Sequence, residues 1–180
     1  MPDVSTVRGR GIAVATKRRP DRGFVVRRAT SRDVAAITAL RLDLLREEAL
    51  NPLFADPHPD AARRALRLTR RQLASATQVF FVAMRGQVAV GLLRCRVIRR
   101  TPLVAGTRQA MVTTAYVVPS ERRRGVLRAL LDAADRWCRR HHLSGMRLQC
   151  ALTNDTGRRA WESLGFKPAE LLYLRAVPPA

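Results

Sequence analysis

The chain has 180 residues, 47% of them hydrophobic, and a formal net charge of +20 at pH 7. This length suits one domain with one core, and no apolar run approaches the roughly 20 residues of a membrane span. The three cysteines are widely spaced among apolar residues, which favours buried thiols over disulfides, and no Cys or His pair has the spacing of a metal site. We therefore expect a cytoplasmic protein without a metal.

The basic residues are nearly all arginine, and the charge is unevenly distributed. Residues 31–60 carry three basic and six acidic side chains, whereas residues 61–180 carry 23 basic and six acidic ones. A strongly basic chain favours contact with nucleic acid, although a solvated basic surface explains the same composition. The acidic segment runs against the trend and would favour a cationic partner.

The first 22 residues combine arginine with glycine and proline and have no sustained hydrophobic period. We predict that they form a flexible basic tail, followed by a single domain over residues 23–180. Within this domain the hydrophobic pattern switches repeatedly between the periods of strands and helices. The predicted elements, in chain order, are a strand at 24–28, a helix from Thr30 or Ser31 to about Leu45, a helix at 61–75, strands at 78–84, 88–98 and 109–118, a helix at 123–140, a strand at 146–152, a helix at 154–164 and a last strand or pair at 166–177.

The order of these elements predicts the fold class. The two adjacent strands before residue 100 are joined by a tight glycine turn, which indicates antiparallel pairing. The strand, helix and strand from 109 to 152 indicate a parallel pair with a right-handed crossover. We expect an α/β fold with a mixed antiparallel and parallel central sheet flanked by helices.

An arginine-rich turn with one glycine lies between the strand ending at Val118 and the long helix. Free peptide N–H groups at a helix start, together with the helix dipole and guanidinium groups, form a ready site for a pyrophosphate. Gly125 would let the backbone approach the phosphates closely. Leu127 falls in helical phase with the apolar stripe, so its side chain is expected to face the sheet.

These residues resemble the acetyl-coenzyme A signature of the GNAT acyltransferase superfamily, in which Arg or Gln is followed after two residues by Gly and then, after one more, by Gly or Ala. Arg122, Gly125 and Leu127 take those places, and Asn154 with the Leu-Gly-Phe ending at Phe166 resembles the second signature. The similarity covers about residues 23–177.

The resemblance implies acetyl-CoA as the cosubstrate. Main-chain groups before the turn would pair with the pantetheine arm and stabilise the developing oxyanion, and Asn154 would contact the arm or fix the loop beside it. Plain capping of the following helix is an equal alternative for Asn154. The expected cofactor-binding residues are Tyr116, Val117, Val118, Arg122, Arg123, Arg124, Gly125, Val126, Leu127, Arg128 and Asn154.

The catalytic residues are less well defined by the pattern. Trp161 stands where many family members carry a tyrosine that protonates the leaving thiolate, and indole cannot act as that acid. Tyr116 or Tyr173 could replace it. The strand before the turn offers no carboxylate base, so Glu47 and Glu48, at the end of the first helix, are the best candidates.

The resemblance implies an N-acetyltransferase that moves an acetyl group to a primary amine, on a small molecule or as an exposed amino group, by direct attack in a ternary complex. The alternative is a catalytically impaired GNAT scaffold that binds nucleic acid or regulates through its basic surface. For an active enzyme, the basic surface also predicts nonspecific contact with nucleic acid. We expect no membrane partner. A homodimer is a further expectation, since dimers are frequent in the family.

Overall fold

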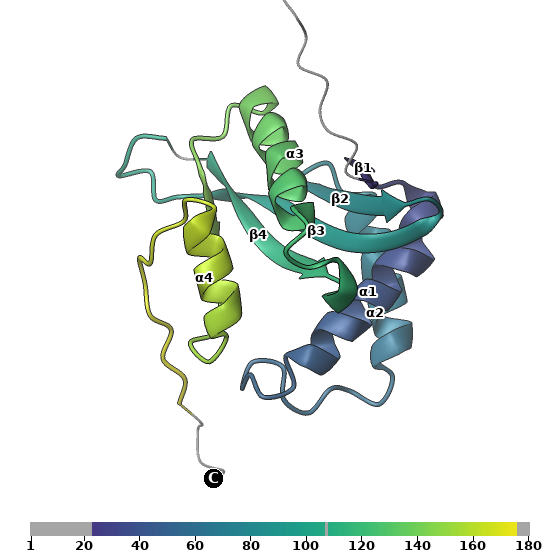
Figure 1. Cartoon of the computed structure of the whole chain (residues 1–180). Coiled ribbons are helices and arrows are strands. Elements are labelled where there is room, and N and C mark those ends of the chain that lie inside the picture. Colours follow the sequence, from purple (N-terminus) through teal and green to yellow (C-terminus); the bar gives the residue numbers. More distant parts are fainter. Residues whose placement is uncertain (1–22, 107, 176–180) are drawn as a thin grey trace, which may run out of the picture.

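The computed structural model describes residues 23–106 and 108–175, so the predicted flexible tail lies outside the described residues. Five strands form one sheet in the order β1-β2-β3-β4-β5 (Figure 1). The first four pair antiparallel, and β5 pairs parallel with β4, which confirms the expected mixed sheet. The strands are β1 (Val25–Arg28), β2 (Gln78–Arg85), β3 (Val88–Arg99), β4 (Arg108–Val117) and β5 (Met146–Leu148).

Helices cover both faces of the sheet, as Figure 1 shows. Helices α1 (Val34–Glu47) and α2 (Ala61–Leu73) lie on one face, and α3 (Val126–Arg140) lies on the other. The short helix α4 (Asp155–Ser163) follows β5. Two 3-10 turns, η1 (Ser31–Asp33) and η2 (Pro119–Glu121), lead into α1 and toward α3. The expected alternation of strands and helices is therefore present.

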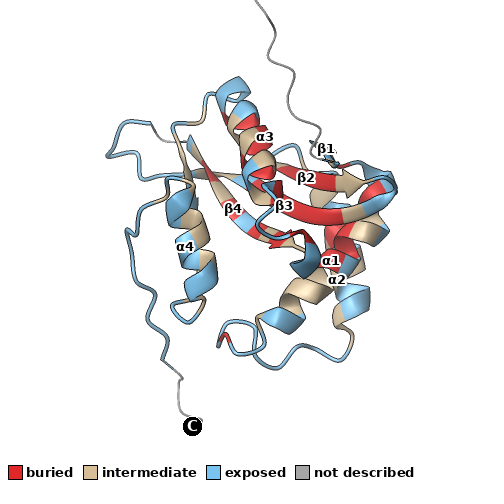
Figure 2. Ribbon diagram, viewed as in Figure 1, coloured by how far each residue is buried: buried red, intermediate tan, exposed pale blue. Residues whose placement is uncertain are grey.

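The core has two parts, one on each face of the sheet, and buried residues follow the strands and the inner sides of α1 and α3 (Figure 2). On the α3 face, Leu130, Ala134 and Trp137 are buried against the sheet, and Leu127 packs partly buried beside them, as its helical phase predicts. A Cβ at Gly91 would lie 2.9 Å from Cγ1 of Val126. Glycine at this place therefore lets the first turn of α3 approach the sheet closely.

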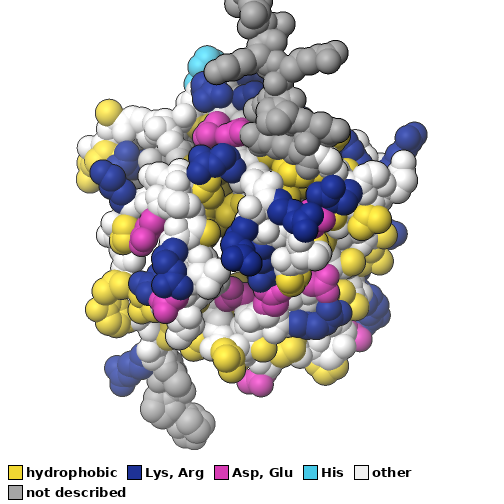
Figure 3. All heavy atoms as spheres, viewed as in Figure 1, with side chains coloured by type: hydrophobic (Ala, Val, Ile, Leu, Met, Phe, Trp, Pro, Cys, Tyr) yellow, Lys and Arg dark blue, Asp and Glu magenta, His cyan; other side chains and the backbone are white. Residues whose placement is uncertain are grey.

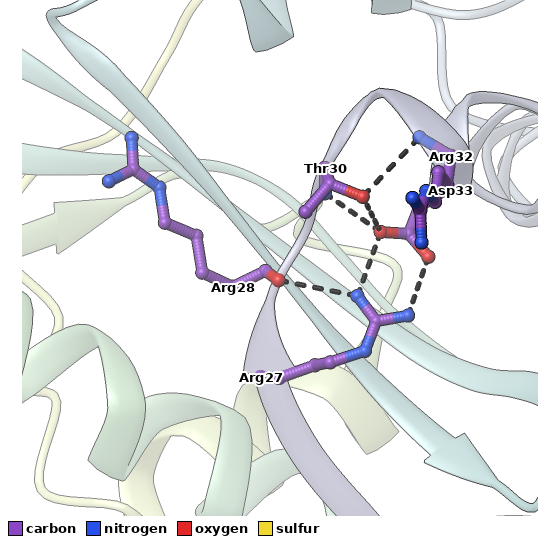
Figure 4. A network of polar contacts seen from close by, with 5 residues as sticks. All are labelled: Arg27, Arg28, Thr30, Arg32 and Asp33. Carbon is purple, nitrogen blue, oxygen red and sulfur yellow. Dashed lines mark hydrogen bonds and ion pairs between the residues drawn. The ribbon is translucent and has the colours of Figure 1, made fainter.

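A network of polar contacts fixes the start of α1 (Figure 4). Thr30 forms a capping box with Asp33, whose carboxylate accepts hydrogen bonds from the Thr30 N–H at 2.7 Å and from Arg27 at 2.7 and 2.8 Å. The Arg27 guanidinium is the main cause that lowers the pKa of Asp33 to about 2. This ionised contact holds β1 against the turn from which α1 runs to the candidate site.

Three predicted boundaries were wrong. The strand expected at 146–152 ends at Leu148, and residues 166–175 form no strand. A strand needs a hydrogen-bonding partner, and the three-residue β5 offers only a short edge. Helix α3 begins at Val126 rather than near residue 123, because Arg123 and Gly125 adopt positive φ angles of 59° and 80° that a right-handed helix excludes.

Three further expectations concern membrane-spanning helices, the cysteines and metal ligands. None of the described helices is both long and apolar enough to cross a membrane. All three cysteines are free thiols: Cys95 and Cys138 are buried, as expected, and Cys150 is half-buried. No group of three potential metal ligands occurs in residues 23–106 and 108–175.

Candidate active site

The arginine-rich turn is anchored to the sheet just before it reaches α3. Glu121 is buried in η2, and its carboxylate accepts hydrogen bonds from the Arg85 guanidinium at 2.7 and 2.9 Å. That guanidinium lowers the pKa of Glu121, which keeps the ion pair charged at neutral pH. Gly125 then turns the chain into α3 in the left-handed conformation. The path of the turn is thus set by a partly buried ion pair on one side and by a glycine on the other.

The first turn of α3 presents free backbone donors, as expected for a phosphate site. Within the described residues, the N–H groups of Val126, Leu127 and Arg128 have no backbone acceptor outside the helix, and the first peptide N–H with such a bond is that of Ala129, to Gly125. A Cβ placed on Gly125 would meet no atom within 4 Å, so space lies open beside the helix start. Open space next to unbonded N–H groups and a positive helix dipole suits a pyrophosphate.

The edge of β4 becomes unpaired near the turn. Strand β5 pairs with β4 only from Ala110 to Val112, whereas β4 continues to Val117. The Val118 N–H donates to Val90 of β3 at 3.0 Å. Because main-chain groups alternate sides along a strand, this bond directs the N–H and C=O groups of Ala115 and Val117 toward the open edge. Val118 was expected to offer main-chain groups to the cosubstrate, but its N–H is bonded to Val90 and its C=O accepts the Glu121 N–H at 2.9 Å, so neither group is available.

A second cluster joins the end of α1 to β4 and to the turn. The Tyr116 hydroxyl donates to Glu47 at 3.0 Å, and Nη2 of Arg122 donates to both oxygens of the same carboxylate at 2.7 and 2.6 Å. Nε of Arg122 donates to the Val117 carbonyl at 2.9 Å, and its guanidinium carbon lies 5.6 Å from the centre of the Tyr116 ring. Three predicted site residues, Glu47, Tyr116 and Arg122, thus meet at one carboxylate, and Arg122 links it to the backbone of Val117.

Tyr116 keeps its proton over the physiological pH range. Burial is the main cause that raises the pKa of its phenol to about 12, and the hydrogen bond to Glu47 adds to the effect. Desolvation disfavours the charged phenolate, and so does the neighbouring carboxylate. At neutral pH this group is a proton donor held in a fixed direction.

Glu48 lies in a different environment from Glu47. Its carboxylate accepts hydrogen bonds from two side-chain amides, Asn51 at 2.9 Å and Asn154 at 3.3 Å. Asn154 also caps α4, since its Oδ1 accepts the Gly157 N–H at 2.8 Å. The capping role and the site contact expected as alternatives for Asn154 therefore occur together. Glu47 is paired with a guanidinium, whereas both hydrogen-bond partners of Glu48 are neutral amides.

Not every predicted residue joins these contacts. Tyr173 is 84% exposed and makes no hydrogen bond or ring contact within the described residues, and Trp161 packs edge-on against Phe166 at 5.4 Å. The side chains of Arg123, Arg124 and Arg128 are exposed around the turn. Sequence reasoning did not single out Asn51, nor Glu121 with its partner Arg85. An acidic residue inside an arginine run was the available signal for the last pair.

The arginines do not form one continuous basic surface on this side of the molecule. Figure 3 shows them as separate groups with acidic side chains between them. Together, the sheet with one parallel pair, the unpaired edge of β4 and the free N–H groups at the helix start that follows it are the features expected of an acyltransferase fold.

Comparisons with known proteins identify the class more closely. Residues 42–166 match the profile of the acetyltransferase (GNAT) family. The chain belongs to the GNAT family of acetyltransferases, as the sequence motifs predict. This confirms an acyl-coenzyme A dependent N-acetyltransferase that uses acetyl-CoA, and it gives no support to the alternative of an impaired scaffold that binds nucleic acid. A search of curated proteins finds no match.

Solved structures confirm the fold. The aminoglycoside acetyltransferase AAC(6')-Iy, in complex with the bisubstrate analogue CoA-S-monomethyl-acetylneamine, has a TM-score of 0.68 at 22% identity over 87% of this chain and 99% of that one. A predicted acetyltransferase from Clostridium acetobutylicum, solved with acetyl-CoA, has a TM-score of 0.70 at 20% identity over 84% and 96%. The apo 6'-N-acetyltransferase AAC(6')-IG from Acinetobacter haemolyticus has a TM-score of 0.68 at 19% identity over 87% and 99%. At these identities the likeness concerns the fold alone.

Proposed function

We propose that this chain transfers an acetyl group from acetyl-CoA to a primary amine by direct attack in a ternary complex formed between β4, the start of α3 and the end of α1. The proposal depends mainly on three features that lie together. They are the free N–H groups at the start of α3, the unpaired edge of β4 and the Glu47 cluster, which belong to residues 113–128 and to the end of α1.

The cosubstrate would be held mainly by backbone groups. Pyrophosphate oxygens would accept hydrogen bonds from the free N–H groups of Val126, Leu127 and Arg128, while the exposed guanidinium groups around Gly125 add positive charge. The pantetheine arm would pair with the open edge of β4, where the N–H groups of Ala115 and Val117 point. Such contacts need no particular side chain, which agrees with the apolar residues at these places.

The chemistry requires an oxyanion donor, an acid and a free amine. The thioester supplies an acetyl group, whose C–S bond breaks as a C–N bond to the amine forms, so that the amine loses one proton and the thiolate takes one. An N–H at the open edge of β4 would stabilise negative charge on the carbonyl oxygen. Tyr116 is the proposed acid, because its phenol is protonated at neutral pH and oriented by Glu47.

The acceptor would be bound as a cation and attack as a free amine. Glu48 is the better candidate to attract the ammonium, because the carboxylate of Glu47 is already paired with Arg122. A water or carboxylate in this cluster would then accept the proton. The resemblance in fold to aminoglycoside acetyltransferases makes amino sugars one class to test. The homodimer and nonspecific nucleic-acid contact remain predictions.

The cosubstrate site is tested by thermal unfolding with and without acetyl-CoA. At a hundredfold excess over Kd, acetyl-CoA should stabilise the protein by about 2.7 kcal/mol and raise Tm by roughly 5–11 °C. Gly125→Glu should abolish this shift, because a carboxylate would stand beside the pyrophosphate. The open space at Gly125 means that the added side chain meets no atom near its Cβ.

Gly125→Ala is the matched control. It imposes the same left-handed strain, since φ is 80°, but it adds no charge. Its Tm should fall while most of the acetyl-CoA shift remains. An unchanged shift in Gly125→Glu would refute the assigned site. Release of free CoA with a panel of amines then measures the transfer itself and identifies the acceptor class.

A further inference from the structure

Two arginines lie between the sheet and the α1/α2 layer without any acidic partner among the described residues. Arg94, in the middle of β3, is 9% exposed, and its Nε donates to Gln78 at 3.0 Å. Arg41 of α1 is half-buried and donates to Thr69 at 3.0 Å and to Gln72 at 2.8 Å. All of these acceptors are neutral oxygens.

The Arg94 guanidinium carbon also lies 5.6 Å from the centre of the Phe80 ring, but no carboxylate among the described residues pairs with either arginine. Burial, followed by repulsion from Arg41 and the exposed Arg96, lowers the pKa of Arg94 to about 10. Burial also lowers the pKa of Arg41. Buried charges are normally paired, because desolvation is costly without a counterion. An anion placed between these groups would remove the repulsion and use the remaining guanidinium donors.

The two arginines share a sheet face with the candidate active site. Arg94 pairs in register with Thr114 of β4, and the next pair on the same face is Leu92 with Tyr116. Thr114 is buried at 8% exposure, and its hydroxyl has no hydrogen bond within the described residues. Residues two apart in a strand are about 6.6 Å apart, so Thr114 neighbours Arg94 across the two strands and Tyr116 along β4. The Arg94 guanidinium itself reaches toward Gln78 of β2.

Helix α1 gives a second, independent spacing. Arg41 and Glu48 are seven residues apart, which is about two turns and about 10 Å along one helix face. The candidate anion site and the candidate ammonium site therefore stand side by side on α1 and on the sheet, separated by the length of a short extended molecule.

We propose that Arg94 and Arg41, with Thr114 beside them, bind an anionic group of the acceptor, so that the acceptor is a molecule with a primary amine at one end and a carboxylate at the other. This inference rests on the proposed transfer to an amine and narrows its substrate class. A planar guanidinium fits a carboxylate through two parallel hydrogen bonds, which makes arginine suited to this group. A polycation would instead be repelled by the same residues.

Turnover of a matched pair of acceptors tests the proposal. ε-Aminocaproate carries amine and carboxylate at opposite ends, and its neutral amide differs only in that charge. Wild type should prefer the acid by roughly ten- to hundredfold in kcat/KM, the value of a charge-assisted hydrogen bond. Arg94→Gln should remove the preference by raising KM for the acid, with KM for acetyl-CoA unchanged. Arg99→Gln, an exposed position on the same strand, should behave as wild type.

A binding measurement separates this site from catalysis. N-Acetyl-ε-aminocaproate, added without acetyl-CoA, should raise Tm of wild type and Arg99→Gln but not of Arg94→Gln. If acetyl-CoA gave no shift in Tm while N-acetyl-ε-aminocaproate still did, the proposed acetyl transfer would be refuted and the anion site would be supported. If Arg94→Gln did not fold, Arg41→Gln should show the same loss. Equal turnover of acid and amide by wild type, or an unchanged preference in folded Arg94→Gln, would overturn the proposal.

Discussion

Asp33→Asn should destabilise the protein through the network that starts α1. The carboxylate accepts four hydrogen bonds, two from Arg27, one from the Thr30 N–H at 2.7 Å and one from its hydroxyl at 3.1 Å, and the side chain is only 7% exposed. An amide of the same shape cannot form the ion pair with Arg27. The variant also tests how firmly β1 is joined to the helix that carries Glu47 and Glu48.

The magnitude follows from the pKa. A fall from 3.8 to about 2 corresponds to about 2.4 kcal/mol of stability at neutral pH, at 1.36 kcal/mol for each tenfold change in the acid constant. In a domain of this size, that loss lowers Tm by roughly 5–10 °C. Because the folded-state pKa is lowered, the stabilisation is present above about pH 4 and is lost as pH falls toward 2. About half of it should remain at pH 3.

The assay is urea unfolding at 25 °C, followed by circular dichroism at several pH values between 7 and 2. Asp43→Asn is the control, because Asp43 is 39% exposed and pairs with Arg46 on the helix surface, where such pairs contribute at most about 0.5 kcal/mol. The difference between wild type and Asp33→Asn should narrow steadily below pH 4. The reasoning would be refuted if the difference in unfolding free energy between wild type and Asp33→Asn stayed constant down to pH 2. It would also be refuted if that difference at pH 7 were no larger than the one caused by Asp43→Asn.

Two further predictions concern catalysis. Tyr116→Phe should lower kcat by roughly 10²- to 10⁴-fold and leave KM for acetyl-CoA unchanged, because only the proton donor is removed. The pKa of the phenol is raised to about 12, so kcat of the wild type should show no loss from ionisation of Tyr116 up to pH 10. A kcat within a factor of two of wild type would assign the acid elsewhere. Glu48→Gln should raise KM for a cationic acceptor roughly ten- to hundredfold with little change in acetyl-CoA binding, since a charge-assisted contact is lost. Steady-state kinetics with both substrates varied measure this, and an equal rise in both KM values would point to a damaged fold.

Local sequence signals located most elements because they depend on neighbours in the chain. Thr30 caps the turn before α1, Gly86 turns β2 into β3 in the left-handed conformation, and Gly165 ends α4 in the same way. The helical phase of Leu127 also depended only on its own helix. The strand expected at 166–177 failed because β-pairing needs a partner edge, which the local pattern cannot supply.

In the candidate site, too, some features depend on neighbouring residues in the chain and others on contacts between distant ones. The arginine-rich turn, Gly125 and Asn154 were found from a motif, since the binding of a pyrophosphate at a helix start is encoded in adjacent residues. Glu47 and Glu48 were candidates for the base because the strand before the turn offers no carboxylate. Their different surroundings became visible when Arg122 was found on one carboxylate and two amides on the other.

The sequence by itself predicted the mixed sheet, because hydrophobic periodicity is a local property, and the resemblance of its two motifs to the GNAT signatures predicted the family and the cosubstrate. Only the tertiary structure brought Tyr116 to Glu47, 69 residues away, and Arg41 to the α2 side chains that hold it. The same is true of Arg94, which looked like one more basic residue in a chain of net charge +20 until its burial, with no acidic partner in residues 23–106 and 108–175, set it apart. Long-range packing decides which charges are compensated, and this decides where an acceptor can bind.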